Sequence, residues 1–300
     1  MAQESTFHPT IAVIAAHNED RFIGSVVLKT RRYVDRVIVV DDGSTDLTAQ
    51  VAAEAGALVL QHDCNQGKAE AVNTGLKQAR EMDAAIVVLI DGDGQHDPAQ
   101  IPTLLAPIEA QQADLVVGSR FLNARSRIPR WRIIGQHALT LATNVASGVT
   151  LTDSQSGFRA LSRTALQTLS FRPQGKFSIE SEMQFLVHEH RLTVLEVPVT
   201  MVYAEKPKRN PFGHGFQVLN AIIVLVSQHR PLFFFGVPGL IIMLAAFVLG
   251  MVVIERYNTY QTLAVGYALI SIMLGIVGIQ AVFTGIILHS IRAFLTNGRS

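Results

Sequence analysis

Two carboxylates separated by one residue are the strongest chemical signal in the sequence. Asp91 and Asp93 follow an apolar, β-branched run and open the segment DGDGQH at 91–96. Carboxylate and amide oxygens are the ligands that Mg²⁺ and Mn²⁺ prefer. Magnesium typically takes one or two carboxylates and completes its shell with phosphate and water. The pair therefore predicts a divalent metal that bridges to a diphosphate.

Other loop motifs fit the sequence poorly. An EF-hand calcium loop opening at 91 would need glycine and glutamate where His96 and Pro102 stand. A dinucleotide-binding fingerprint would need G-x-G-x-x-G after the first strand, where residues 15–20 read AAHNED. A P-loop would need a glycine at His62, five residues before Gly67. The sequence thus disfavours a calcium loop, a classical dehydrogenase and a P-loop NTPase.

Alternating apolar runs and helical patterns predict the elements that position these residues. Strands are expected at 10–16, 36–40, 57–61, 84–90 and 115–118, and helices at 23–33, 45–55, 67–80 and from Pro98 onward. Ser44 is the expected N-cap of the helix at 45–55. This β-α-β-α rhythm predicts an α/β fold with a mainly parallel sheet that is covered on both faces.

Polar clusters follow three of the expected strands. The first strand ends at His17-Asn18-Glu19, the second at Asp41-Asp42 and the fourth at Asp91. Each cluster alone could be ordinary turn chemistry. Ligands of open α/β sheets bind outside the carboxyl ends of the strands. The joint placement of the three clusters therefore predicts one site.

The chain is poor in charged residues, and this deficit is concentrated in its C-terminal region. Charged residues make up 16% of the 300 residues of the chain, against about 25% in typical soluble domains. None lies between Pro231 and Ile254, a stretch that would be about 36 Å long as a helix and could cross a hydrocarbon core of about 30 Å. We expect two transmembrane helices, at about 231–254 and 262–290, with two buried core helices as the alternative.

Basic residues suggest how the two spans are oriented. They flank the spans on the side of the termini, at Lys206, Lys208, Arg209, Arg230, Arg292 and Arg299, while only Arg256 lies in the expected connection. The positive-inside rule then puts the N-terminal part and both termini in the cytoplasm. The basic group at 206–209 either anchors the chain near anionic lipid or binds an acceptor phosphate.

Global composition excludes several other classes. The net charge is +1, which gives no field for nucleic acid, and Cys64 is the only cysteine, so no internal disulfide can form. The first nine residues have no apolar core and do not resemble a signal peptide. The apolar content and small net charge argue against disorder.

We expect three parts: a cytoplasmic catalytic domain at 1–210, an interfacial linker at 211–230 and the membrane helices at 231–300. Residues 131–149 and 212–228 have amphipathic patterns. Both segments either lie in the membrane interface or are helices of a soluble core. The two-helix hairpin also allows a homo-oligomer through the membrane.

Seven motifs in this order resemble glycosyltransferase family 2 with the GT-A fold. The nearest resemblance is to its polyprenyl-phosphate branch, which includes dolichyl-phosphate mannose and glucose synthases. The motifs are HNE (17–19), VVDDGSTD (39–46), NQGK (65–68), DGDGQH (91–96), GSR (118–120), TDSQSGFRA (152–160) and EVPV (196–199). Together with the apolar tail they cover nearly the whole chain.

The resemblance implies a role for each matched residue. Asp42 and Glu19 would contact the nucleotide, while Asp91, Asp93 and Gln95 would hold Mg²⁺ or Mn²⁺ on the donor diphosphate. Arg120 would approach the phosphates, and Asp153 would lie where donor and acceptor meet. Asp93, Asp153 and Arg120 form the implied catalytic set. The remaining expected binding residues are His17, Asn18, Lys68, Gly92, Arg159, Lys206 and Arg209.

Some of these residues have second interpretations. Lys68 could simply face solvent on its helix. Glu180 and Glu182 could line the acceptor side or only begin a helix, whose dipole favours acids there. His96 could support the site from behind or fill a turn. The first motif lacks the proline that family members often have before its histidine position, which leaves the choice of donor open.

The implied reaction is metal-dependent, inverting transfer of a sugar to a polyprenyl phosphate. The donor would be a GDP- or UDP-linked sugar, with mannose or glucose expected. The alternatives are another lipid or glycan acceptor, as in a glycolipid or polysaccharide synthase, and a non-enzymatic membrane scaffold. A processive synthase would need more spans for a channel, and the residues before Arg130-Trp131-Arg132 do not complete its Q-x-x-R-W-like motif.

Overall fold

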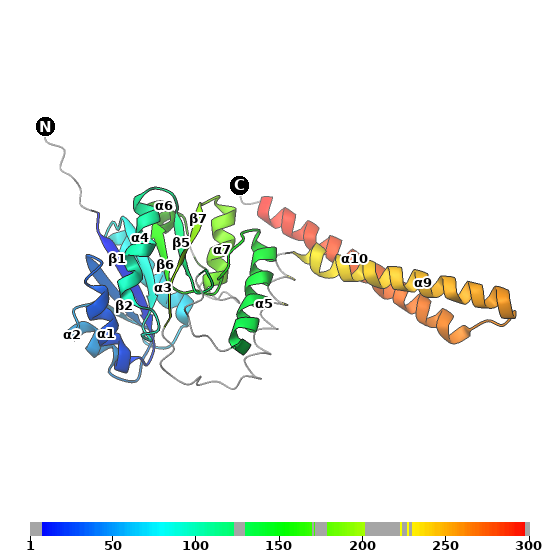
Figure 1. Cartoon of the computed structure of the whole chain (residues 1–300), viewed down its shortest axis with the longest axis horizontal. Coiled ribbons are helices and arrows are strands. Elements are labelled where there is room, and N and C mark those ends of the chain that lie inside the picture. Colours follow the sequence, from blue (N-terminus) through cyan, green and yellow to red (C-terminus); the bar gives the residue numbers. More distant parts are fainter. Residues whose placement is uncertain are drawn as a thin grey trace. The chain divides into compact units, whose positions relative to one another are not determined.

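Figure 1 shows the computed structural model of the chain. The structure describes residues 8–122, 130–169, 171, 179–201, 223, 227 and 230–297. Lys206, Lys208, Arg209 and nearly all of the amphipathic segment at 212–228 lie outside the described residues. The chain divides into two compact units, Met1–Ala221 and Ile222–Ser300. The assignment of 211–230 as a separate interfacial linker stays a prediction.

The first unit contains a seven-stranded, mostly parallel sheet (Figure 1). Its strand order is β3-β2-β1-β4-β6-β5-β7, and β6 runs antiparallel to both of its neighbours while the other pairs are parallel. The strands are β1 (Thr10–Ala16), β2 (Arg36–Asp41), β3 (Leu58–Gln61), β4 (Ile86–Asp91), β5 (Leu115–Ser119), β6 (Arg159–Ser162) and β7 (Val194–Pro198). The predicted α/β class is confirmed.

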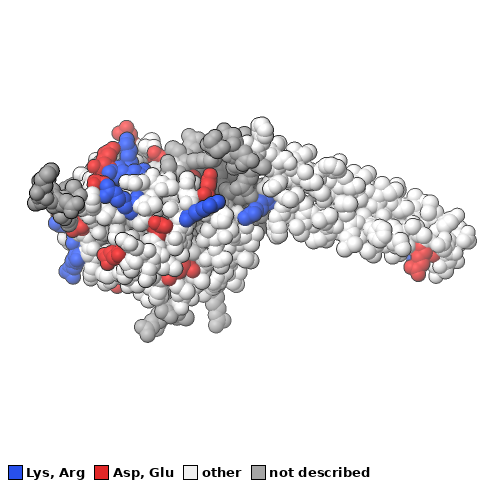
Figure 2. Space-filling view, turned by 90° about the horizontal axis from the view of Figure 1, so that it is seen from above, with Lys and Arg blue, Asp and Glu red and all other residues white. Residues whose placement is uncertain are grey.

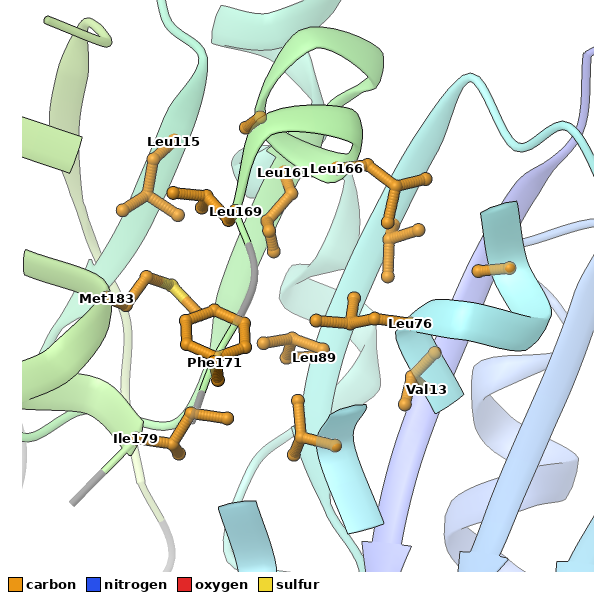
Figure 3. Packing of buried hydrophobic residues seen from close by; sticks show 14 of the residues in the cluster. Val13, Leu76, Leu89, Leu115, Leu161, Leu166, Leu169, Phe171, Ile179 and Met183 are labelled. Carbon is orange, nitrogen blue, oxygen red and sulfur yellow. The ribbon is translucent and has the colours of Figure 1, made fainter. Parts of the chain in front are cut away.

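Helices cover both faces of this sheet, which explains the uninterrupted apolar strands. The described helices are α1 (Asp20–Thr30), α2 (Thr48–Glu54), α3 (Lys68–Glu81), α4 (Ile101–Glu109), α5 (Arg130–Ser147), α6 (Arg163–Thr168) and α7 (Ile179–Glu189). Alternate residues of β1 enter different hydrophobic clusters: Ile11 and Val13 pack on one face, and Ala12 and Ile14 on the other. In Figure 3, Phe171 of the first cluster lies among Leu89, Ile179 and Met183.

Helix α3 approaches the sheet closely at a glycine. A Cβ on Gly75 would lie 2.3 Å from Cγ1 of Val13 in β1, so a larger residue would push the helix away. A glycine inside a helix costs about 1 kcal/mol relative to alanine, and here it allows direct packing of helix on strand. This packing fixes the position of α3, whose first residue is Lys68.

The predicted cap of α2 is wrong. The helix begins at Thr48, three residues later than expected, and Ser44 does not cap it. Instead, the Ser44 hydroxyl accepts a hydrogen bond of 2.9 Å from the backbone N–H of Asn18. Asp46 accepts from the backbone N–H of Thr48 at 2.9 Å, so the acid two residues further on organises the start of α2.

The second unit is a helical hairpin. A π-helical turn (Leu232–Gly236) leads into α9 (Val237–Tyr260), and α10 (Val265–Asn297) packs against α9. Gly239 and Gly278 let the two helices approach, because a Cβ on Gly239 would lie 2.9 Å from the Gly278 carbonyl oxygen. Figure 2 shows an almost uninterrupted surface without charged residues over this hairpin, whereas charged side chains gather on the other unit.

Two helical segments are long and apolar enough to cross a membrane, namely Leu232–Tyr260 and Val265–Ile291. The connection expected around Glu255 and Arg256 is instead helical, and the chain reverses just after α9, where Gln261 has a φ of 51°. Glu and Arg are good helix formers, so charged residues can extend an apolar helix rather than end it.

Candidate active site

Parallel pairing brings the predicted site residues to one edge of the sheet. β1 pairs in parallel with β2 and β4, so Ala16 is level with Asp41 and Ala15 with Asp91. The carboxyl ends of β1, β2 and β4 therefore meet, as predicted. Because β6 is antiparallel to β4, the TDSQSG segment that precedes Arg159 arrives at this same edge.

The cluster after β1 fastens the first two strand ends together. Asn18 has a left-handed φ of 55°, and its side-chain oxygen accepts a 2.9 Å hydrogen bond from the backbone N–H of Thr45. His17 donates from Nδ1 to the Asp42 carbonyl at 2.9 Å. The backbone N–H of Glu19 donates to the Thr48 hydroxyl at 2.8 Å. The predicted nucleotide-binding residues His17, Asn18 and Glu19 thus lie beside the DDGSTD loop.

Asp42 is buried and holds a neighbouring loop. Its carboxylate accepts hydrogen bonds from the backbone N–H groups of Gln66 and Gly67, at 2.9 and 2.8 Å, and from Nδ1 of His62 at 2.8 Å. Burial acts to raise the pKa of Asp42, but the Gln66, His62 and Gly67 hydrogen bonds outweigh it, so the pKa lies below its ordinary value. Asp42 was expected to contact the nucleotide, and in the structure its carboxylate oxygens accept hydrogen bonds from the chain's own Gln66, Gly67 and His62.

Lys68 lies between two acids. Its Nζ is 2.6 Å from Oδ1 of Asp91 and 2.8 Å from Oε1 of Glu180. Burial acts to lower the pKa of Lys68, but the two carboxylates outweigh it and raise that pKa. A Cβ on Gly157 would lie 2.8 Å from Oδ2 of Asp91 and 3.0 Å from Nζ of Lys68, so the glycine of the TDSQSG segment makes room for the ion pair.

Asp93 and Asp91 have the donor chemistry of a divalent-metal site. Burial first, and then the negative charge of Asp91, raise the pKa of Asp93 above its ordinary value. A cation bound between the two carboxylates would relieve this repulsion. Among the residues that the structure describes, no three His, Cys, Asp or Glu side chains are placed to hold a metal. Two carboxylates supplemented by phosphate and water are nevertheless a usual Mg²⁺ set, so the residues fit the group.

The backbone around this pair is shaped by small residues. A Cβ on Gly92 would lie 3.2 Å from Cβ of Ala16 and 3.3 Å from Cδ1 of Ile23. Gly94 has a φ of 71°, which turns the chain so that the backbone N–H of Gln95 donates to Asp93 at 3.0 Å. His96 is buried and stacks on Phe158 with ring centroids 5.0 Å apart, so it supports the loop from behind.

Arg120 and Asp153 form a buried bidentate ion pair. Arg120 donates from Nε and Nη2 to the two carboxylate oxygens, both at 2.6 Å, and Asp153 is fully buried. Arg120 is also close enough to Asp91 to help lower the pKa of that acid, after the larger effects of burial, which raises it, and of Lys68 and His96, which lower it. Arg120 therefore lies near Asp91, and the ion pair brings Asp153 to the same part of the site.

Arg159 binds the backbone of its own loop. It is 1% exposed, and it donates to the carbonyl oxygens of Ser156, Glu180 and Ser154 at 2.8, 3.0 and 2.7 Å. These three bonds tie the TDSQSG segment to the first turn of α7. Arg159 was expected to bind phosphate, and in the structure it holds the loop beside the Asp91–Lys68 pair.

The described residues of the predicted site thus lie together at this edge, whereas Lys206 and Arg209 fall outside the described ranges. Two further residues, Glu196 and His62, hold this arrangement together, and no role for them was expected from the sequence. Glu196 accepts hydrogen bonds from the backbone N–H groups of Thr152 and Asp153, at 2.7 and 3.0 Å. The motif EVPV could have indicated this role, because an acidic residue within a strand needs hydrogen-bond donors for its carboxylate. His62 directly follows β3, and its Nδ1 is hydrogen-bonded to the Asp42 carboxylate at 2.8 Å.

Residues 11–170 match the family model described as Glycosyl transferase family 2. The chain belongs to this family. It is therefore a glycosyltransferase, and the non-enzymatic scaffold is excluded. The expected family is confirmed by this match, which spans the segments from β1 to α6.

Related glycosyltransferases support the polyprenyl-phosphate branch. The UDP-N-acetylglucosamine–dolichyl-phosphate N-acetylglucosaminyltransferase of Methanococcus voltae is 34% identical over 215 residues, covering 64% of this chain and 85% of the relative. The undecaprenyl-phosphate mannosyltransferase of Micrococcus luteus is 28% identical over 207 residues, covering 65% and 84%. Both names describe sugar transfer to a polyprenyl phosphate.

A solved structure supports the fold of this glycosyltransferase. Glucosyl-3-phosphoglycerate synthase from Mycobacterium tuberculosis, in complex with Mn²⁺, UDP and glucosyl-3-phosphoglycerate, matches with a TM-score of 0.55 and 25% identity. The match covers 74% of this chain and 80% of that one. The first unit accordingly has a GT-A-like fold, as the resemblance implied.

In this glycosyltransferase α5 buries several polar side chains and exposes several large apolar ones. Thr140, Thr143 and Ser147 are buried, and the Thr140 hydroxyl lies 3.1 Å from that of Ser154 in the TDSQSG segment. On the outer side, Ile134, Leu141 and Val145 are 72%, 65% and 42% exposed. Their spacing of seven and four residues places them on one helix face. The helix therefore presents an apolar stripe to its surroundings.

Proposed function

We propose that this glycosyltransferase transfers a sugar from a nucleotide-diphosphate donor to a polyprenyl phosphate, with inversion, at the cytoplasmic face of a membrane. One observation carries the proposal: a single chain joins a carboxylate pair at the ligand-binding edge of a GT-A-like sheet to two helices of membrane-spanning length. The named relatives support the acceptor class. The orientation with both termini in the cytoplasm rests on the flanking basic residues.

Asp91, Asp93 and Gln95 would hold Mg²⁺ or Mn²⁺ in this proposal. The two acids carry the donor chemistry. Burial and then the negative charge of Asp91 raise the pKa of Asp93, and this proximity of two carboxylates supports a cation between them. When bound, the metal supplies Lewis-acid stabilisation of the departing diphosphate. Arg120 would add positive charge beside the phosphates, because its guanidinium acts on Asp91 from the adjacent ion pair.

The nucleotide would bind beside the ends of β1 and β2. Glu19, His17 and Asn18 lie next to the DDGSTD loop, which supports a role for them in one wall of such a pocket. The Asp42 carboxylate already accepts from Gln66, Gly67 and His62. We therefore expect Asp42 to shape the donor pocket chiefly by holding the NQGK segment in place.

An anionic acceptor removes the need for a strong general base. A phosphate monoester has a second pKa near 6, so its oxygen is largely ionised at neutral pH. The residues at the sheet edge would then align that oxygen with the anomeric carbon, and direct displacement would invert the sugar. Asp153 suits a positioning role, because both of its oxygens accept hydrogen bonds from Arg120.

The apolar stripe of α5 would lie against the lipid that presents this acceptor. A helix that exposes a row of large apolar side chains needs an apolar partner, and an amphipathic helix can place its apolar face about 5–10 Å into the headgroup region. The same chain has two helices of membrane-spanning length, which would anchor it to a bilayer.

A fluorescent probe on this stripe tests its lipid contact. In a Cys64→Ser background, Leu141→Cys labelled with an environment-sensitive dye should show blue-shifted emission in nanodiscs and quenching by spin-labelled lipid. Leu28→Cys is the matched control, because Leu28 is 57% exposed on α1. Equal emission and quenching at the two positions would contradict the lipid contact of α5.

A donor screen tests the proposed reaction. The full chain in nanodiscs, with Mn²⁺ or Mg²⁺ and undecaprenyl or dolichyl phosphate, is incubated with GDP-mannose, UDP-glucose and UDP-N-acetylglucosamine. We expect one donor to give a lipid-phosphate sugar, read by mass spectrometry and abolished by EDTA. Donor hydrolysis without a lipid product would indicate a glycolipid or glycan acceptor instead. No turnover of any donor would contradict the proposal.

A further inference from the structure

Glu180 lies beside the predicted metal site through its contact with Lys68, although it is 89 residues beyond Asp91 in the sequence. A pocket at the end of β4 is lined by Lys68, Asp91, Gly157, Arg159 and Glu180. Lys68 bridges the two acids, at 2.6 Å from Asp91 and 2.8 Å from Glu180. One ammonium group is therefore shared between two carboxylates.

The position of Glu180 is fixed from three sides. It belongs to the first turn of α7 and its side chain is only 10% exposed. Its carbonyl oxygen accepts from Nη1 of Arg159 at 3.0 Å. The next residue, Ser181, accepts from the side-chain amide of Gln155 at 3.0 Å. The start of α7, which carries Glu180, is thus held by Arg159 and by the TDSQSG segment.

The position of the Lys68 ammonium controls how much of the negative charge of Asp91 is available to another cation. Lys68 contacts Asp91 within ion-pair distance, so it competes with any other cation for that carboxylate. Glu180 draws the same ammonium toward α7 and adds its own charge to the cluster. Without Glu180 the cluster would be less negative, and the ammonium would pair with Asp91 alone.

We infer that Glu180 is a positioning residue for the proposed metal site. It holds the Lys68 ammonium on the α7 side of Asp91 and so leaves Asp91 able to bind a divalent cation. The inference rests on the metal dependence in the proposed function and assigns Glu180 a part in it. Partners of metal ligands commonly change metal affinity by about 10- to 100-fold when they are mutated.

The test is a Mn²⁺ titration of the full chain in nanodiscs, without donor, followed by electron paramagnetic resonance of free Mn²⁺. Glu180→Gln should raise the Kd for Mn²⁺ about tenfold. Glu189→Gln is the matched control, because Glu189 is exposed at the other end of the same helix. The control should bind Mn²⁺ like the wild type.

A second variant separates positioning from a structural role in α7. Lys68→Met combined with Glu180→Gln removes the competing ammonium, so the Kd for Mn²⁺ should return to within about threefold of the wild-type value. A residue that only stabilised the start of α7 would give no such recovery. If Glu180→Gln does not fold, Lys68→Met alone still decides, since it should bind Mn²⁺ more tightly than the wild type.

The outcomes distinguish this inference from the function on which it rests. If the wild type does not bind Mn²⁺, the proposed metal dependence fails and the role of Glu180 fails with it. If the wild type binds and Glu180→Gln binds equally well, only the role of Glu180 is overturned. Failure of the double variant to recover would overturn it as well, as would weaker or unchanged binding by Lys68→Met.

Discussion

Replacing Asp93 with asparagine is expected to lower the rate of sugar transfer by about a thousandfold, a loss of about 4 kcal/mol of transition-state stabilisation, while the chain keeps its fold. The amide cannot supply an anionic metal ligand. Its oxygen can still accept from the backbone N–H of Gln95, and the repulsion from the Asp91 carboxylate disappears. Initial rates at saturating donor, measured over a Mn²⁺ series, would show the loss.

Asp97→Asn provides the control for this measurement. Asp97 lies four residues further on, is exposed, and accepts from the backbone N–H of Ala99 at the start of a short 3₁₀ turn, Pro98–Gln100. Asparagine caps as well as aspartate, so this variant should transfer sugar at nearly the wild-type rate. Substantial sugar transfer by the Asp93→Asn variant would contradict the proposal that the metal binds at Asp93.

Melting temperature gives an independent readout for the Asp93 variant. Mn²⁺ that binds only the folded chain raises its stability by mass action. The wild type should therefore melt at a higher temperature when Mn²⁺ is added, and Asp93→Asn should respond much less. In the absence of metal the two proteins should melt at similar temperatures, because the substitution preserves shape.

The sheet edge was predictable because its signals are local in the sequence. β1 has the expected bounds, and the apolar runs of β2 and β4 end at the expected acids. A parallel sheet buried on both faces makes such strands continuously apolar, and it aligns their carboxyl ends. The types of residue after three strands were therefore enough to place Asp42, Asp91 and Glu19 in one region.

The partners of the charged site residues were not predictable, since they depend on long-range pairing. Arg159 had the appearance of a phosphate ligand, yet its donors are satisfied by three backbone carbonyls. That arrangement exists because β6 inserts antiparallel beside β4 and brings the TDSQSG segment to α7. The sequence of a four-residue strand such as β6 does not indicate whether it runs parallel or antiparallel to its neighbours.

Short polar residues misled the prediction where several of them compete for one role. Ser44 stands at a plausible cap position, but the backbone N–H of Asn18 uses its hydroxyl. The left-handed conformation of Asn18 and the bond from Asn18 Oδ1 to Thr45 then fix the loop. A cap depends on which donor reaches it, and this donor lies 26 residues away.

The buried pair of Arg120 and Asp153 leads to the second large effect. Asp153→Asn should lower the stability of the first unit by about 3 kcal/mol, because it leaves the Arg120 guanidinium buried without its counter-charge. For a unit of this size that loss corresponds to a fall of about 10 °C in melting temperature. Thermal unfolding of the full chain in nanodiscs, followed by circular dichroism, would measure it.

A neutral double variant separates this structural role of Asp153 from a chemical one. Arg120→Gln with Asp153→Asn removes both charges and keeps hydrogen-bonding groups, so most of the lost stability should return. Transfer should stay low in the double variant, since Arg120 no longer offsets charge near Asp91 and the phosphates. If Asp153→Asn instead melts like the wild type and has lost its transfer activity, Asp153 acts directly in the reaction. The ion pair of 2.6 Å and the complete burial of Asp153 favour the first outcome, because a carboxylate held in this way is not free to accept a proton from an acceptor.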